Sequence, residues 1–434
     1  MATTKLTRTP ASSGTGARKK MTWSWWVKRS KLGATQYLYN QYNSSDQYNS
    51  GILFQNDDKF RYWDYGSSGN DLNLITNRKF RDTSAWYHIV LAIDTTQGTS
   101  SNRVKLYVNG VQETSFSTET YPNQDHQIRM NEAQVQQIGF QGYGSTYQSY
   151  FDGSMSHINF VDGLQLDASA FGSTDNTTGE WQITTAPSVT YGTNGFFILK
   201  DSNSVTDQSG NSNNFTVGGG TLTKTEDCPS NVFATLNALI NTTTYNGDKL
   251  SNGNNTASSS TNYKGTIWST LGASTGKYYW EAKAGDGGNA FGIVNDQINN
   301  NVWSLGSTGN YVIWNNNGNI ERPSGSTASG TTFALNDIIG VAWNATDGEI
   351  TFYKNGTAIN SGTAYSVSGT QGTMFASVSD TSTGGNPTAH FNFGNGYFGT
   401  TAVSSAGTNA SGNGIFEYDV PNGFTALSTK GLNL

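Results

Sequence analysis

Residues 86–94 (WYHIVLAID) form an apolar run that leads through a polar loop into residues 103–110 (RVKLYVNG), and this stretch decides the fold. In the second run, valine and leucine alternate with more polar residues. Successive side chains of a strand point to opposite faces, so the apolar ones share one face. The run ends at Asn-Gly, which accepts the positive φ that a tight hairpin turn needs. The stretch therefore predicts the middle of an antiparallel sheet.

The same pattern returns in the second half of the chain. Residues 337–344 (DIIGVAWN) lead through a shorter loop into residues 349–356 (EITFYKNG). A duplicated pattern predicts two similar domains. At 434 residues the chain is long enough for two β-domains of roughly 200 residues each. We assign residues 21–225 to the first domain and residues 226–434 to the second, which ends in a Ser/Gly/Asn-rich tail.

The composition predicts a folded all-β protein with a polar, weakly charged surface. Charged residues make up 13% of the chain, about half the usual share of about 25%, so amides and hydroxyls must supply the solubility. The aromatic content of 12% argues against disorder. A net charge of −6 gives no attraction to nucleic-acid phosphates. The sequence has no long apolar run and no signal-peptide core, so we expect no membrane insertion.

Two segments are predicted to lie outside the folded domains. Residues 1–20 have no apolar period and no acidic residue, so we expect a flexible basic N-terminal arm. This arm is either a frayed end or a tether that docks on an acidic surface of a larger assembly. Its basic residues are Lys5, Arg8, Arg18, Lys19 and Lys20. The glycines at 218–220 and the Cys228-Pro229 pair predict the linker between the domains. Cys228 is the one cysteine and cannot form an intrachain disulfide.

Both halves resemble known families. The first-half pattern, with residues 151–153 (FDG) and 157–160 (HINF), resembles the laminin-G/concanavalin A-like jelly roll. The second-half pattern, with residues 276–281 (GKYYWE) and 291–294 (FGIV), resembles a SPRY domain, which is itself a concanavalin-like sandwich. The resemblance implies two concanavalin A-like antiparallel jelly-roll sandwiches in tandem, laminin-G-like first and SPRY-like second.

Catalysis is disfavoured by the distribution of reactive side chains. The four histidines have no zinc-motif spacing, and no Gly-x-Ser-x-Gly elbow is present, although spacing alone leaves a Ser-His-Asp triad open. The fold also houses glycosidases, which need two carboxylates about 5–9 Å apart. Here Asp152, Glu281 and Glu349 lie singly on different predicted strands. We therefore expect no enzymatic activity and no cofactor.

Laminin-G domains often hold calcium through loop oxygens, so the resemblance raises a calcium site on aspartates of the first domain. Possible oxygen ligands are Asp46, Asp64, Asp71 and Asp152. They lack the spacing of a calcium loop, and turn aspartates are commonly solvated. We predict no metal site.

Binding is the better-supported role. The loops are rich in Asn, Ser, Thr, Gly and Tyr, which hydrogen-bond and stack with little loss of entropy. In the second domain, Trp303 and the run 311–314 (YVIW) flank a polar turn. Alternation places Tyr311 and Trp314 on opposite faces, so one belongs to the core and the other can form an exposed platform. The candidate ligand-binding residues are Trp303, Tyr311 and Trp314.

The chain is also similar to virion proteins of marine bacteriophages. The resemblance is carried by residues 5–10 (KLTRTP), 26–29 (WVKR), 151–153 (FDG), 191–196 (YGTNGF) and 416–421 (FEYDVP). It implies a non-enzymatic virion structural protein, such as a tail fibre, receptor-binding or capsid-decoration protein. Such a protein is assembled in the host cytoplasm and exposed on the particle surface.

The same resemblance implies the partners. They are other virion proteins and a host cell-surface glycan or receptor, with adhesion through carbohydrate binding. We expect a homo-oligomer, and we expect the five basic residues of 1–20 to attach it to the particle. Two alternatives remain open: a glycan hydrolase on the same fold and a cellular SPRY-type peptide-binding adaptor.

Overall fold

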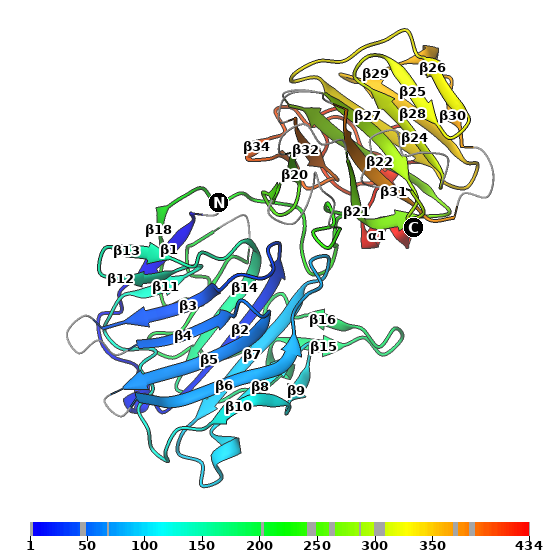
Figure 1. Ribbon diagram of the computed structural model, residues 1–434. Helices are drawn as coiled ribbons and strands as arrows, with labels where there is room; N and C mark the ends of the chain where they lie inside the picture. The colour runs from blue at the N-terminus through cyan, green and yellow to red at the C-terminus, as the bar shows by residue number, and fades with distance from the viewer. Residues whose placement is uncertain are drawn as a thin grey trace. The chain divides into compact units, whose positions relative to one another are not determined.

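The computed structural model describes residues 3–43, 49–66, 69–200, 204–240, 249–259, 265–285, 288–298, 309–367, 372–381 and 387–433. The chain divides into two compact units, Met1–Lys224 and Thr225–Leu434. Each unit is a sandwich built from antiparallel sheets, which confirms the predicted all-β class (Figure 1). Among the described residues, no helix is long and apolar enough to cross a membrane.

Within these residues, the first unit packs an eight-stranded sheet against a six-stranded sheet. The eight-stranded sheet has the order β10 (Phe116–Thr120), β6 (Gly69–Lys79), β5 (Lys59–Gly66), β4 (Asn49–Phe54), β3 (Gln36–Tyr42), β11 (Gln136–Ile138), β1 (Lys5–Arg8), β18 (Thr216–Gly219). The six-stranded sheet has the order β17 (Phe196–Ile198), β14 (Gly153–Asp162), β2 (Lys20–Arg29), β7 (Tyr87–Asp94), β8 (Val104–Val108), β9 (Val111–Glu113). Smaller elements are the hairpins β12 (Gln141–Tyr143) with β13 (Thr146–Gln148) and β15 (Gly172–Thr174) with β16 (Trp181–Ile183), and the 3-10 turns η1 (Thr15–Arg18), η2 (Ser100–Asn102) and η3 (Ala168–Ala170).

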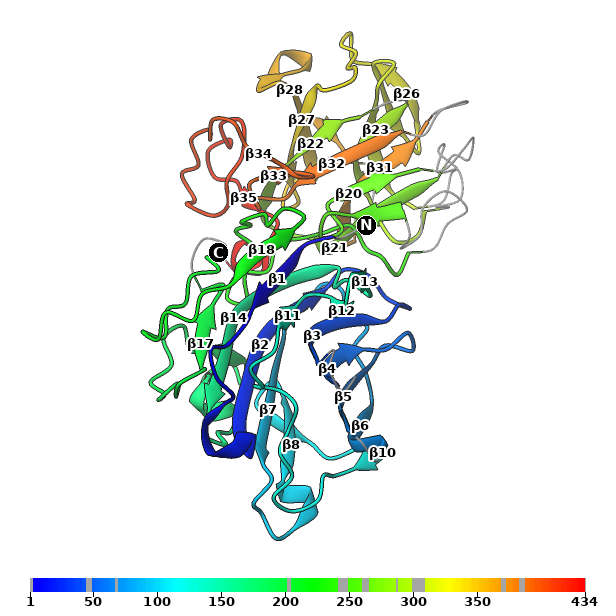
Figure 2. The same cartoon turned by 90° about the vertical axis from the view of Figure 1, so that its left-hand side faces the viewer.

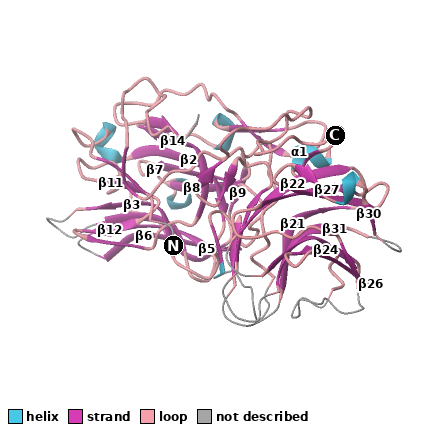
Figure 3. Cartoon of the chain, turned by 90° about the horizontal axis from the view of Figure 1, so that it is seen from above, coloured by secondary structure: helices cyan, strands magenta, loops and turns pink. Residues whose placement is uncertain are grey.

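The second unit, in its described part, packs a nine-stranded sheet against a six-stranded one. The larger sheet has the order β19 (Leu250–Ser251), β20 (Thr256–Ser258), β32 (Thr388–Asn392), β22 (Lys277–Ala284), β27 (Ile338–Asn344), β28 (Glu349–Lys354), β29 (Thr357–Ala358), with β30 (Tyr365–Ser366) beside β28 and β35 (Thr425–Ala426) beside β22. The smaller sheet has the order β21 (Thr266–Ala273), β31 (Met374–Asp380), β23 (Asn289–Val294), β24 (Tyr311–Asn315), β25 (Asn319–Arg322), β26 (Gly325–Ala328). The hairpin β33 (Tyr397–Phe398) with β34 (Thr401–Ala402), η5 (Asn360–Gly362) and the short helix α1 (Thr429–Leu432) complete it; Figure 3 separates helices from strands by colour.

The core of the first unit is rich in aromatic rings. Trp23 and Trp25 of β2 are fully buried and stack with their ring centroids 5.0 Å apart. They share the inner face of β2, as the alternating sequence predicts. Burying such large side chains is a main favourable term of folding, worth about 1.5–3 kcal/mol for each large apolar residue.

The deciding stretch forms the predicted hairpin in both units. In the first unit β7 pairs with β8, and the turn residue Asn109 has φ +48°. The Asn109 Oδ1 accepts a hydrogen bond from the backbone N–H of His88 at 2.8 Å. In the second unit Asn355 has φ +47°, and its Oδ1 accepts from the backbone N–H of Ile338 at 2.8 Å. Each asparagine thus makes the turn that follows β8 or β28 and also ties it to the start of the neighbouring strand, β7 or β27.

An aromatic ring covers the glycine of each turn. Gly110 has φ +81°, and a Cβ built there would overlap the Trp181 ring of β16. Gly356 has φ +79°, and a Cβ there would overlap the Tyr418 ring. Glycine is therefore needed at both positions for the backbone angle and for the close approach of the ring.

We expect Gly110→Ala and Gly356→Ala each to lower the free energy of unfolding of its unit by about 2 kcal/mol or more. The left-handed conformation alone costs a non-glycine residue about 1–2 kcal/mol, and the new methyl group must also displace a ring. Chemical denaturation of the full chain measures the effect. Gly98→Ala is the control because no atom lies within 4 Å of its Cβ position. Equal stabilities of the Gly110→Ala and Gly98→Ala proteins would contradict the expectation.

The prediction that residues 1–20 form a flexible arm is wrong, because Lys5–Arg8 form a strand inside the eight-stranded sheet. Strand β1 pairs with β11 on one side and with β18 on the other, as Figure 2 shows. Leu6 of β1 is 3% exposed and belongs to the core. Further along, the backbone N–H and hydroxyl of Thr15 both donate to the Asp162 carboxylate at 2.9 Å. One buried leucine and one carboxylate hold a segment that has no apolar period of its own.

The glycine run is also structural in part. Gly218 and Gly219 belong to β18, and the first unit extends to Lys224. The predicted linker at 218–220 therefore lies inside the first unit. A glycine run often marks a break in regular structure, but Gly218 and Gly219 lie in the outermost strand of the sheet.

Candidate functional site

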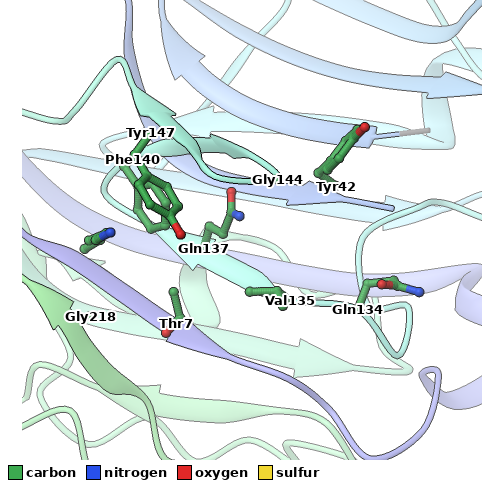
Figure 4. Close-up of a pocket in the computed structure, with 10 residues that line it drawn as sticks. Thr7, Tyr42, Gln134, Val135, Gln137, Phe140, Gly144, Tyr147 and Gly218 are labelled. Carbon is green, nitrogen blue, oxygen red and sulfur yellow. The ribbon is translucent and has the colours of Figure 1, made fainter. Parts of the chain in front are cut away.

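A cavity of about 310 Å³ lies in the first unit on the outer face of the eight-stranded sheet. It is found where β1, β11 and β18 meet the β12–β13 hairpin (Figure 4). The lining residues are Lys5, Thr7, Tyr42, Gln134, Val135, Gln137, Phe140, Gly144, Tyr147 and Gly218. They come from four separate stretches of the chain and include ring faces, amides, hydroxyls and one ammonium group.

Strand alternation aims these side chains at the cavity. Leu6 of β1 and Ile138 of β11 point into the core of the sandwich. Their strand neighbours Lys5, Thr7 and Gln137 therefore point to the opposite, outer face. The same sheet thus buries one set of residues and presents the other set to a ligand.

A network of amides holds the β12–β13 hairpin against the sheet. The Gln137 Oε1 accepts from the backbone N–H of Gly142 at 2.9 Å and from the Asn40 Nδ2 at 2.7 Å. The Gln141 Nε2 donates to the Tyr37 hydroxyl at 2.8 Å and lies 2.6 Å from the Tyr143 hydroxyl. Buried amides with several partners fix side-chain positions. The wall of the cavity is therefore preorganised.

Beside the cavity, the outer face carries a second aromatic group. Tyr37, Leu53 and Trp63 form a buried cluster separate from the core. A Cβ at Gly51 would lie 2.7 Å from the Trp63 Nε1 and 2.8 Å from the Tyr37 Cε1, so this glycine lets both rings lie flat on the sheet. The Arg61 guanidinium lies 5.4 Å from the centre of the Trp63 ring. These residues form a packed aromatic cluster beside the cavity and do not line it.

The predicted platform in the second domain is not exposed. Trp303 lies outside the described residues. Tyr311 is 5% exposed and Trp314 is fully buried, with its Nε1 donating to the Thr331 carbonyl at 3.2 Å. Trp314 belongs to the main core, and Tyr311 packs in a second apolar cluster with Ile313 on the outer face of the sheet. The prediction was wrong because both faces of β24 are covered.

Four of the five basic residues of 1–20 bind groups of their own unit, which argues against their predicted role as free attachment points. They make the following contacts: Arg18 with Glu132 at 3.2 Å, Lys19 with Asp125 at 3.0 Å, Lys20 with Asp94 at 3.1 Å, and Arg8 with the Gln136 Oε1 at 2.9 Å and the Asn194 carbonyl at 3.2 Å. The fifth, Lys5, lines the cavity. Folding back of the segment brings these charges onto partners that are distant in sequence.

A serine and a histidine lie together in the first unit, but their arrangement is inert. The Ser24 Oγ lies 2.9 Å from the Nε2 of His88, and both residues are fully buried. On the other side of the ring, the Trp181 Nε1 donates to the His88 Nδ1 at 2.9 Å. Because Nδ1 accepts, the proton of the neutral ring is on Nε2, so this nitrogen cannot take a proton from Ser24. Burial lowers the pKa of His88 to about 3, which keeps the ring neutral.

The carboxylates that were considered for glycoside hydrolysis have structural surroundings. Glu281 is fully buried in β22, where its two oxygens accept from the backbone N–H groups of Glu417 and Tyr418 at 2.8 and 2.9 Å. Glu349 is exposed in β28. Asp152 belongs to the other unit, and burial raises its pKa. No two of these three form a facing pair in one groove.

Two of the four candidate calcium ligands lie together. Asp64 and Asp71 each bring an oxygen, and His126 a ring nitrogen, within 4.8 Å of one another. The Asp64 oxygens already accept from the His126 Nε2 and from the backbone N–H of Arg129, both at 2.9 Å. Asp152 is elsewhere, and Asp46 lies outside the described residues. The absence of a metal ion stays a prediction.

Comparison with known families supports the order of the two domains. The profile of the concanavalin A-like lectin/glucanases superfamily, a laminin-G type, matches residues 3–169. The SPRY domain profile matches residues 277–396. The chain thus carries a laminin-G-type domain and a SPRY domain in tandem. Domains of these kinds are typically binding modules rather than enzymes. The first match begins at residue 3, in agreement with the place of β1 in the sheet.

Solved structures give fold likenesses that each cover about a third of the chain. The SPRY domain of human HERC1 has 15% identity and a TM-score of 0.28, covering 32% of this chain and 87% of that one. A native heptameric SAP-like pentraxin from Limulus polyphemus has 16% identity and a TM-score of 0.29, covering 38% and 71%. Stonustoxin has 14% identity and a TM-score of 0.29, covering 37% and 28%. A search of curated protein sequences found no match.

Proposed function

We propose that this protein is a non-enzymatic binding protein whose first unit takes up a saccharide in the cavity on its eight-stranded sheet. The observation that carries the proposal is the preorganised mixture of ring faces and amides around 310 Å³ of space. Tyr42 and Tyr147 offer ring faces, and Gln134 and Gln137 offer amide groups. Sugars present C–H faces and hydroxyls, which match rings and amides.

Substitution of a ring in the cavity tests this role. We expect Tyr42→Ala to weaken binding of the tightest-binding oligosaccharide by about two- to tenfold, because a lost ring contact costs roughly 0.5–1.5 kcal/mol. Tyr65→Ala is the control, since Tyr65 is 42% exposed on the same sheet but does not line the cavity. A glycan array identifies the ligand, and calorimetry measures the affinities. If no saccharide in the array binds, the proposal fails.

The non-enzymatic part of the proposal has its own test. The His88 tautomer cannot accept the Ser24 proton, and both oxygens of Glu281 already accept hydrogen bonds from backbone N–H groups. We therefore expect no new reducing ends when the full-length protein is incubated with plant, algal and bacterial polysaccharides. Reproducible cleavage that is absent from a Glu281→Gln protein would instead establish the glycan hydrolase.

We further propose that the protein is a bacteriophage virion component, assembled in the host cytoplasm and exposed on the particle. The tandem order of the two domains and the weakly charged, amide-rich surface support this role. Its partners would be other virion proteins and a host surface glycan, with assembly as a homo-oligomer. Mass spectrometry of purified particles, with antibody labelling in electron micrographs, tests this role. Absence of the chain from purified particles would contradict it.

A second candidate is a peptide-binding adaptor of the SPRY type. The match of residues 277–396 to the SPRY profile favours it. If the protein co-purifies with a cytosolic partner and not with virus particles, the adaptor function would be supported.

A further inference from the structure

The cavity contains a positive charge that the protein itself leaves uncompensated. Arg18, Lys19 and Lys20 each pair with a carboxylate. Arg8 is held by amide and carbonyl oxygens. Among the described residues, the Lys5 ammonium has no carboxylate and no hydrogen-bonding oxygen; it lies 3.4 Å from the centre of the Tyr147 ring and 5.9 Å from that of Phe140.

The fold fixes this ammonium in place. Lys5 pairs with Gly219 of β18, and the next residue, Leu6, pairs with strands on both sides, which restrains the backbone at Lys5. A Cβ at Gly219 would lie 2.9 Å from the Lys5 Cε, so the glycine of β18 leaves room for the lysine stem. The ring of Tyr147 then holds the charge through a cation–π contact. The glycine run and the lysine of the N-terminal segment thus serve one site.

The charge also selects among ligands. The described residues that line the cavity include no carboxylate; besides Lys5 they offer amides, hydroxyls and rings. A neutral sugar that covers the ammonium can accept its N–H donors through hydroxyl oxygens, but it leaves the positive charge partly desolvated and uncompensated. A ligand with a negative group would compensate the charge and accept its N–H donors.

We propose that the cavity binds an acidic saccharide, with one carboxylate or sulfate group placed on the Lys5 ammonium. This inference rests on the proposed saccharide-binding function and adds the charge of the ligand. Tyr42 and the amides Gln134 and Gln137 then contact the neutral part of the sugar. The position of Lys5 beside a ring limits the charged contact to a single anionic group.

Binding of matched oligosaccharides to the full-length protein tests the inference. The probes are an oligogalacturonate, a sulfated galactan oligomer and a neutral galactan oligomer of equal length. The carboxylate and sulfate arms identify which anionic group is preferred. We expect one acidic probe to bind about tenfold tighter than the neutral one, as a single charge-assisted contact allows. This preference should weaken with added salt, because exposed charges are screened.

Two lysine variants give the decisive comparison. Lys5→Gln should remove both the preference for the acidic probe and its salt dependence. Lys79→Gln is the matched control, because Lys79 is exposed on β6 of the same sheet and does not line the cavity. Hydrogen exchange of β1 checks that Lys5→Gln leaves the strand folded.

The other outcomes separate failure of the acidic ligand from failure of the saccharide-binding function. Equal affinities for acidic and neutral probes, or an unchanged preference in Lys5→Gln, would overturn the acidic ligand while the saccharide-binding function stands. If none of the three probes binds but the glycan array gives another, neutral ligand, the acidic inference is likewise overturned. If no saccharide binds at all, the proposed function fails and this inference fails with it.

Discussion

Replacing Asp58 by asparagine is expected to lower the free energy of unfolding of the first unit by about 3–5 kcal/mol, the usual cost of breaking a buried ion pair. Asp58 is 4% exposed and accepts from the Arg29 guanidinium at 3.1 Å, where Arg29 is fully buried against the Phe54 ring. Asparagine keeps the shape and tolerates the positive φ of +67° at this position. The decrease in the free energy of unfolding therefore measures the cost of leaving the Arg29 charge without its carboxylate partner. Hydrogen exchange of core peptides in the full chain measures it.

The neighbouring Asp57→Asn substitution is the control. The Asp57 carboxylate is 44% exposed and lies 3.6 Å from the Lys59 ammonium, and such surface pairs contribute about 0–1 kcal/mol. Burial opposes ionisation of Asp58, but the N–H of Gly33 and the Arg81 and Arg29 guanidinium groups outweigh it and lower the pKa. Stabilisation by a lowered pKa is present above the unfolded pKa and is lost as pH falls. The gap between the natural and Asp58→Asn proteins should close below about pH 4. Equal effects of both substitutions would contradict the ion-pair account.

Removal of the Glu281 side chain is expected to have a similar effect on the second unit, about 3–5 kcal/mol at pH 5. Glu281→Ala leaves the N–H groups of Glu417 and Tyr418 and the hydroxyl of Tyr279 without their acceptor, and each buried unpaired donor costs about 1–3 kcal/mol. The segment around Phe416, which is 1% exposed, should then exchange its amide hydrogens faster. Hydrogen exchange with mass spectrometry of residues 415–420 measures this release. Glu349→Ala, at an exposed position of β28, should change little.

The same carboxyl group makes the second unit sensitive to pH. Burial raises the pKa of Glu281 to about 7, although the N–H groups of Glu417 and Tyr418 and the Tyr279 hydroxyl favour the charged form. The folded unit therefore holds a proton that the unfolded chain releases above its ordinary value of 4.5. Stability from a raised pKa is full below the unfolded value and is lost as pH rises through the folded one. We expect the unit to be less stable at pH 8 than at pH 5, with this difference reduced in Glu281→Ala. An identical pH dependence in both proteins would contradict the assignment.

The features that the sequence predicted correctly are local. The pairs β7–β8 and β27–β28 follow from alternation, and the turns β8–β9 and β28–β29 follow from Asn-Gly; both signals are properties of a few consecutive residues. The alternation along β2 likewise accounts for Trp23 and Trp25 sharing one face in the core. The two domain families followed from the order of several such local patterns.

The features that were missed depend on residues distant in sequence. Strand β1 has only four residues, and its partners β11 and β18 come far later in the chain. The alternation at Tyr311 and Trp314 shows that two faces exist, but it does not show that a second apolar cluster covers the outer one. The cavity is assembled from four stretches of the chain that are distant in sequence. The one local signal for it was the glutamine-rich run 134–137, which matched no known motif.

The pairing of Lys5 with Gly219 has a consequence for the way the first unit folds. The sheet cannot be completed until the last strand of the unit has been synthesised, so this unit should fold late during translation and slowly afterwards, as non-local β topologies do. Its two ends lie side by side, which makes the unit suitable for circular permutation. A permutant that joins residue 219 to residue 4 by a short linker and opens in the exposed loop at 99–101 should regain the native sheet. Its refolding should be faster than that of the natural order, because the β1–β18 pair becomes a local hairpin.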